Sequence, residues 1–195
     1  TLAERMQYFG DIESRLHARY PNHNLVVRNI AWSADTISLR PRPKSFGDIH
    51  QYLSEVKAYV ILACYGFNET WDYKGENGIN RFKTDLESFI KELQSKNYNG
   101  LTAPKIILYS PLACEGNVVP DNKERNRLIS LYSNTMKNVA ISHGIPFIDL
   151  YNASLKLYQQ DNDTSYTING IHLTAEGYAK LAPSILPDSL FAPLP

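Results

Sequence analysis

The sequence predicts an α/β protein with three layers, in which helices cover both faces of a parallel sheet. Short apolar stretches alternate with longer stretches whose apolar residues recur about every three to four positions, as in strands joined by helices. The most apolar stretch, Ala58–Tyr65, contains almost no polar residue, as expected for a strand covered on both faces. Strands joined by helical crossovers run parallel, so an open parallel sheet is expected.

The expected elements follow one another along the chain in alternating order. Strands are predicted at Leu25–Ile30, Ala58–Tyr65, Lys105–Tyr109 and Pro146–Asp149. Helices are predicted at Leu2–Arg19, Phe46–Val56, Ile79–Lys96 and Asn122–His143, and a last one after Thr174. Pro21 ends the first helix, Gly144 suits the end of the long one, and the Thr174 hydroxyl can cap the last.

Composition narrows the possible functions. The 195 residues suffice for one domain, 1–195, and neither a repeat nor an interdomain linker divides them. Twenty basic and twenty acidic side chains give no net charge, so neither nucleic acid nor an anionic membrane is an expected partner. No apolar run reaches the roughly 18 to 20 residues of a membrane span. Because the chain begins at Thr1, we expect a processed or excised segment truncated at its N-terminus.

Three polar segments lie where ligands bind to parallel sheets. Ala31 follows the first predicted strand, Asn68 follows the second, and His172 lies beyond the last. In open parallel sheets the binding site lies outside the carboxyl ends of the strands. These residues are therefore expected to converge at one edge of the sheet. The five histidines show no ligand spacing with acidic residues, so neither a metal nor another cofactor is predicted.

These segments resemble the signature blocks of the SGNH or GDSL-type hydrolases, which are esterases and lipases with a flavodoxin-like sheet. Gly66-Phe67-Asn68-Glu69 matches the Gly-x-Asn-Asp/Glu block, and Asn169-Gly170-Ile171-His172 matches the Asp-x-x-His block. Asn29-Ile30-Ala31-Trp32-Ser33-Ala34 is similar to the second block, with alanine in place of its glycine. Thr1-Leu2 stands where Gly-Asp-Ser-Leu ends, with threonine at the serine position. The sequence of these blocks also resembles SGNH-like domains of large planctomycete-type multidomain proteins.

The resemblance implies a role for each residue that fits a block. His172 would be the general base, and Asn169 would orient it without the negative charge of the usual aspartate. Asn169-Gly170 also reads as a plain turn, and Asp149 could be a substitute acid, although a structural role suits it better.

Asn68 and the backbone N–H of Ala31 would form the oxyanion hole. Thr1 would be the nucleophile, placed at the positive end of the first helix. Glu69 reads as a structural carboxylate of its loop.

The resemblance also implies a gap in the sheet. The family's first strand, which carries the nucleophile, lies in the middle of the sheet and has no counterpart in this chain. Removing a central strand leaves unpaired apolar edges, which are costly. Upstream polypeptide or another segment is therefore expected to complete the sheet.

Hydrolysis of acyl esters, on carbohydrates or small molecules, is the predicted function, in an extracytoplasmic (periplasmic or secreted) setting. The alternative is a catalytically impaired SGNH-like domain that binds a glycan or a protein partner, since three signature residues are replaced. A nucleotide-binding flavodoxin-like domain is disfavoured, because no glycine-rich phosphate loop follows a strand.

Overall fold

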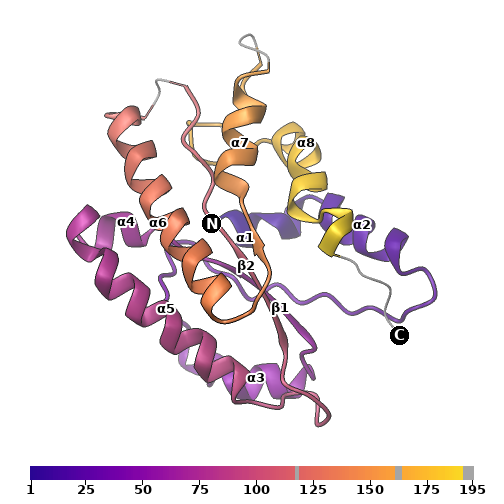
Figure 1. Ribbon diagram of the computed structural model, residues 1–195. Helices are drawn as coiled ribbons and strands as arrows, with labels where there is room; N and C mark the ends of the chain where they lie inside the picture. The colour runs from indigo at the N-terminus through magenta and orange to yellow at the C-terminus, as the bar shows by residue number, and fades with distance from the viewer. Residues whose placement is uncertain (117–118, 161–163, 191–195) are drawn as a thin grey trace.

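The computed structural model describes residues 1–116, 119–160 and 164–190 (Figure 1). Its α-helices are α1 (Leu2–Arg5), α2 (Asp11–Arg19), α3 (Ile49–Glu55), α4 (Glu69–Asp72), α5 (Ile79–Gln94), α6 (Asn122–Ser142), α7 (Leu150–Tyr158) and α8 (Ala175–Ile185). Short 3-10 helices lie at η1 (Met6–Tyr8), η2 (Lys44–Phe46), η3 (Gly75–Gly78) and η4 (Asp188–Leu190). The strands are β1 (Val60–Cys64), β2 (Lys105–Tyr109) and β3 (Phe147–Ile148).

The three strands form one parallel sheet in the order β1-β2-β3. The β1–β2 ladder pairs Val60 with Lys105 at one end and Cys64 with Tyr109 at the other. The β2–β3 ladder is shorter and pairs Tyr109 with Ile148. All three strands therefore end at the same edge, as the sequence predicts.

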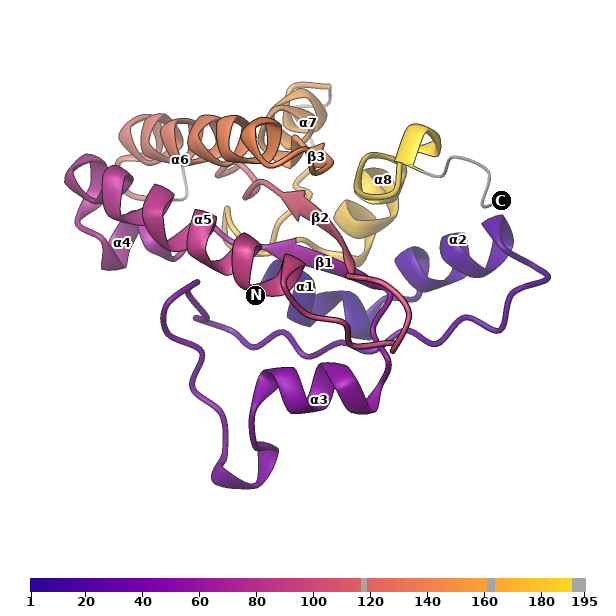
Figure 2. The same cartoon turned by 60° about the horizontal axis from the view of Figure 1, so that its bottom comes forward.

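Side chains of the central strand alternate between two apolar cores. Ile106 and Leu108 pack into one core with α5 and α6, and Ile107 and Tyr109 pack into the other with α2 and α8. α5 and α6 lie on one side of the strands in Figure 1, and α2 and α8 lie on the other. Figure 2 shows the same separation from a second direction. The predicted three-layer α/β architecture is confirmed.

The predicted first strand, Leu25–Ile30, is not a strand in the structure. The segment is extended but pairs with no strand of the described residues. A side chain holds it instead, since Asn29 Nδ2 donates to the carbonyl of Ala3 at 2.6 Å. An apolar β-branched stretch suits a pleated surface, but it becomes a strand only beside a partner with free backbone groups.

Other element boundaries differ from the predicted ones, because local contacts and helix caps override the periodicity of the apolar residues. The helix predicted at Leu2–Arg19 breaks at Phe9, which is extended (φ −126°, ψ 117°) and stacks on Tyr178 at 4.8 Å between ring centroids. Helix α3 starts only after Asp48, whose carboxylate accepts from the His50 and Gln51 amides. The last strand ends early, because Asp149 caps α7, a helix that the periodicity did not predict.

One edge of β1 has no neighbouring strand among the described residues. Tyr59, Val60 and Leu62 are exposed here by 56%, 51% and 37%, large fractions for apolar residues of a sheet. The expectation that an upstream or other segment completes the sheet stays a prediction, and the free edge is where that segment would pair.

Gly66, directly after β1, lies in a turn that leaves little space for a side chain. Its φ is +100°, and an added Cβ would lie 2.8 Å from Met136 Sδ and 3.1 Å from Pro111 Cγ. Gly66→Ala should therefore lower the free energy of unfolding by about 2 to 4 kcal/mol, combining overpacking with backbone strain. Urea unfolding measures this loss. Gly100→Ala is the matched control, since Gly100 has φ +77° but open space around it, and it should cost only the backbone part. Equal losses in both variants would contradict the packing argument.

Candidate active site

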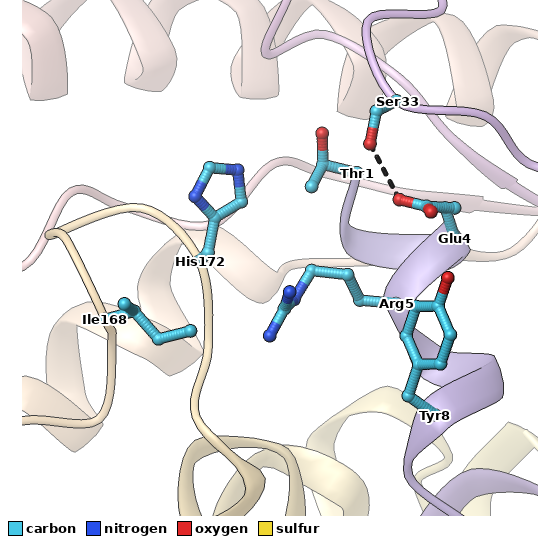
Figure 3. Close-up of a pocket in the computed structure, with 7 residues that line it drawn as sticks. All are labelled: Thr1, Glu4, Arg5, Tyr8, Ser33, Ile168 and His172. Carbon is cyan, nitrogen blue, oxygen red and sulfur yellow. Dashed lines mark hydrogen bonds between the residues drawn. The ribbon is translucent and has the colours of Figure 1, made fainter.

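Thr1 and His172 lie in one pocket although they are far apart in sequence. The pocket measures about 370 Å³ and is lined by Thr1, Glu4, Arg5, Tyr8, Ser33, Ile168 and His172. Figure 3 shows the imidazole ring and the Thr1 side chain facing each other across it. Thr1 precedes α1, and His172 lies on the loop before α8.

Asn169 holds the histidine in one tautomer. Its Oδ1 lies 3.0 Å from His172 Nδ1 and accepts from the backbone N–H of His172 at 3.1 Å and that of Ile171 at 3.3 Å. Because two backbone donors meet this atom, it must be the oxygen, and Nδ1 must carry the ring proton. Nε2 is then the unprotonated nitrogen, free to accept a proton in the pocket.

The loop that carries His172 is clamped by Glu115, a residue that sequence reasoning missed. The Glu115 carboxylate accepts from the backbone N–H groups of Tyr166 and Thr167, both at 2.8 Å, and from the Thr167 hydroxyl at 2.5 Å. Its own N–H donates to the carbonyl of Gly170 at 2.8 Å. The side chain of Glu115 thus fixes one arm of the loop, and its backbone N–H fixes the other. Nothing in the sequence pattern marks this residue, because its partners lie more than fifty positions away.

The Gly66–Glu69 block is a buried turn. The Glu69 carboxylate, which is fully buried, accepts from the amides of Gly66 and Ile37, both at 2.8 Å. Burial raises the pKa of Glu69. Glu69 is therefore structural, as its position indicated, and it ties the block to the preceding loop.

Asn68 lies at the start of α4. Its Nδ2 donates to the carbonyl of Asp35 at 2.7 Å. An amide nitrogen carries two hydrogens, so one remains for another acceptor. Asn68 is not among the side chains that line the pocket of Thr1 and His172, and its role in an oxyanion hole stays a prediction.

The backbone N–H of Ala31 donates to Asn29 Oδ1 at 3.1 Å. The segment is also held by Arg42, which donates to both carboxylate oxygens of Asp35 (2.7 and 2.6 Å) and to the carbonyl of Ile30 (3.0 Å). The left-handed residue of this block is Ala34 (φ 67°), so alanine at position 31 is not strained. Ala31 does not line the pocket, but Ser33 of the same block does.

Thr1 is the N-cap residue of α1 and makes no side-chain cap hydrogen bond. Its hydroxyl is therefore available to the pocket. Because the predicted first helix is broken, α1 contains only four residues, and the dipole expected to favour negative charge at Thr1 is small.

Asp149 does not support His172. Its carboxylate accepts from the backbone N–H of Asn152 at 3.0 Å and from the Asn152 side chain at 2.6 Å. It is a helix cap, as a structural role would require.

Within residues 1–116, 119–160 and 164–190 no group of three or more His, Cys, Asp or Glu side chains is arranged to hold a metal ion. No helix in these ranges is long and apolar enough to cross a membrane.

The pKa of His172 should lie below the usual histidine value. Burial disfavours the imidazolium most, and the nearby positive charges of Arg5 and the Thr1 amine add to the effect. His172 is then neutral, and able to act as a base, over a wider pH range. Arg5→Gln should raise this pKa, because it removes a cation beside the ring. NMR titration of the ring protons measures it, with the unsubstituted protein as reference. An unchanged or lower pKa would contradict the stated cause.

The fold is a parallel sheet between helical layers, and a histidine and a threonine side chain line one pocket beside it. The chain belongs to the GDSL-like Lipase/Acylhydrolase family, whose model matches residues 6–180. The resemblance predicted from the signature blocks is thus confirmed. Thr1 lies before the matched residues, so the family match does not test its role.

Solved structures show the same fold. The acetylxylan esterase Axe2 of Geobacillus stearothermophilus aligns with a TM-score of 0.68 and 19% identity, over 93% of this chain and 80% of Axe2. LAE5, an alpha/beta hydrolase enzyme from the metagenome of Lake Arreo in Spain, aligns with a TM-score of 0.65 and 19% identity, over 92% and 79%. Catalytic mutants of Axe2 replace a serine, an aspartate and a histidine, the aspartate three positions before the histidine. No curated protein matches the chain.

Proposed function

We propose that the chain removes acyl groups from carbohydrates by nucleophilic catalysis. The observation that carries the proposal is the His172–Asn169 pair, in which Nδ1 is bound at 3.0 Å and Nε2 is free, facing Thr1 (Figure 3). Membership of an acylhydrolase family supports the reaction class. The likeness to Axe2, an acetylxylan and acetyl-xylooligosaccharide esterase, supports a carbohydrate ester as the substrate.

In the proposed reaction the Thr1 hydroxyl attacks the ester carbonyl while His172 Nε2 takes its proton. The carbonyl oxygen becomes an oxyanion, which receives hydrogen bonds from Asn68 Nδ2 and the Ala31 N–H. The tetrahedral intermediate expels the sugar alkoxide, which takes the proton from His172. Water then repeats the sequence on the acyl-threonine ester and releases the carboxylic acid. The Ala31 N–H must first leave Asn29 Oδ1, which its 3.1 Å bond now occupies.

Asn169 precedes His172 by three positions, the same spacing that separates the aspartate and the histidine replaced in catalytic mutants of Axe2. An amide fixes the ring but does not stabilise the imidazolium by charge, so turnover should be slow. The methyl group of Thr1 adds crowding at the attacking oxygen.

The same proposal places the protein outside the cytoplasm, where polymeric carbohydrates occur. Fractionation of the cells that produce the protein tests this location.

The second candidate is a domain that binds a glycan or a protein partner without turnover. It is favoured by the uncharged Asn169 and by the Ala31 N–H, which is engaged within its own loop. In that case the pocket would still bind a ligand, but no acyl transfer would follow.

Labelling with an active-site phosphonate, followed by mass spectrometry, tests the proposal. Modification of Thr1 that disappears in His172→Ala supports it, together with hydrolysis of an activated acetyl ester. His17→Ala is the matched control, since His17 is half-exposed on α2 and lies outside the pocket. Modification of Ser33 or Tyr8, which also bring hydroxyl groups to the pocket, would overturn the assignment of Thr1. A folded protein with neither label nor turnover would favour the binding domain.

A further inference from the structure

Arg5 carries a positive charge in the pocket that no carboxylate of the described residues pairs within salt-bridge distance. Its Nη2 donates to the carbonyl of Leu173 at a long 3.3 Å, and its buried Nε has no hydrogen-bond partner in the described part of the chain. The Tyr178 side chain also shares a hydrogen bond with Arg5. Arginine has five N–H donors, so these contacts leave donors for a ligand. A partly buried cation without a carboxylate partner is costly, and a bound anion would offset that cost.

The geometry aims this charge into the pocket. The guanidinium carbon of Arg5 lies over the Phe9 ring, 5.8 Å from its centroid, so this ring helps to hold the charged group in place. Figure 3 shows the guanidinium extending towards the side of the pocket formed by His172 and Ile168. The electrostatic effect of Arg5 on the pKa of His172 agrees with this short approach.

Glu4, the carboxylate of the same pocket, does not neutralise Arg5. It points to the opposite side, where its Oε2 accepts from the Ser33 hydroxyl at 2.7 Å (Figure 3). The pocket therefore has a cationic side next to the proposed base and an anionic side next to the preceding loop. A ligand with a carboxylate fits the cationic side, because a guanidinium binds a carboxylate through two parallel hydrogen bonds.

The exposed side chains around Arg5 suit a sugar ring as the carrier of that carboxylate. Tyr8 and Ile168 line the pocket and are exposed by 65% and 66%. A flat aromatic ring and an aliphatic side chain next to a charged donor offer both an apolar and a polar surface, which a sugar ring with a carboxylate can match.

We propose that Arg5 makes the pocket selective for glycans that carry a uronic acid, whose carboxylate the guanidinium binds. This inference rests on the proposed function for the identity of the site, but the binding it predicts does not require turnover. Arg5 thus selects the substrate, whereas His172 performs the proton transfer.

Equilibrium binding tests the proposal with two matched ligands: a glucuronate-bearing xylo-oligosaccharide and the same oligosaccharide with its uronate reduced to glucose. The wild-type chain should bind the acidic ligand at least about ten-fold more tightly, which corresponds to about 1.4 kcal/mol. Arg5→Gln should remove the difference and Arg5→Lys should keep part of it. Glu4→Gln, which removes the opposite charge of the same pocket, should keep the preference or strengthen it.

Other results would overturn the inference or separate it from the proposed esterase activity. Equal affinity for both ligands, or a preference that survives Arg5→Gln, would overturn the role of Arg5. Competition by sodium succinate with the affinity of the acidic glycan would show that any carboxylate suffices, and would overturn the assignment to a sugar acid. Arg5-dependent binding without ester hydrolysis would support this inference while contradicting the proposed esterase activity.

Discussion

Asn169→Asp should raise kcat for ester hydrolysis, by less than the roughly 10⁴-fold that a serine triad loses in the reverse change, because much of that loss comes from a wrong histidine tautomer, which Asn169 already prevents. Asn169 already holds His172 Nδ1 at 3.0 Å, so the substitution adds charge without moving the ring. The carboxylate would stabilise the imidazolium that forms when Thr1 attacks. It would also raise the pKa of His172, because a negative charge favours the protonated ring. The acidic limb of the pH–rate profile should therefore move to higher pH.

Steady-state kinetics on an activated acetyl ester measures the gain. Asn24→Asp is the control, because it makes the same chemical change at an exposed position outside the pocket. His172→Ala in the Asn169→Asp background should abolish the gain, which shows that the carboxylate acts through the histidine. An unchanged kcat in a folded Asn169→Asp protein would contradict the role proposed for position 169.

Glu115→Gln should destabilise the loop of His172 and lower kcat together. The amide has the same shape, but its NH₂ end would face the N–H groups of Tyr166 or Thr167, which now donate at 2.8 Å. Leaving buried donors without an acceptor costs about 1 to 3 kcal/mol. A displacement of the base by about 1 Å can lower the rate by roughly 10²-fold. We therefore expect both effects from a change that leaves the pocket side chains intact.

Urea unfolding and hydrogen exchange at the amides of residues 166–172 measure the first effect, and kcat on the activated ester measures the second. Glu87→Gln is the control, since Glu87 forms a long 3.7 Å ion pair with Lys83 on the outer side of α5, and the change should alter stability by less than about 0.5 kcal/mol. Full exchange protection of the loop in Glu115→Gln would show that other contacts hold it.

The sequence predicted those elements whose signal is local and strong. Helix α5 and strand β1 lie within their predicted ranges, and Thr174 caps α8 through the Gly177 amide as expected. Leu25–Ile30 failed because the property that makes a strand, a partner with free hydrogen-bonding groups, lies outside the segment itself. Helix α7 was missed because Asp149 reads equally well as the end of a strand and as a helix cap.

The residues of the candidate site also differ in whether a local sequence pattern predicts their contacts. The Asn169–His172 contact follows from a three-residue spacing, so the sequence contains it. Arg5 lies one turn after Thr1, which places both on one face of a helix, and that signal could have been used. Glu115 could not have been found, since its contacts with Tyr166 and Thr167 arise only once two distant loops meet.

The open edge of β1 affects how this chain behaves at high concentration. Tyr59, Val60 and Leu62 border backbone groups to which no strand of the described residues is paired, which makes the edge a template for another extended chain. The formal net charge at pH 7 is zero, so no long-range repulsion keeps two molecules apart. Colloidal stability should thus be poorest near neutral pH and improve on either side of it, until acid or base begins to unfold the protein. A buffer away from neutral pH should therefore suit storage and crystallisation, because charge repulsion then opposes pairing at the open edge of β1.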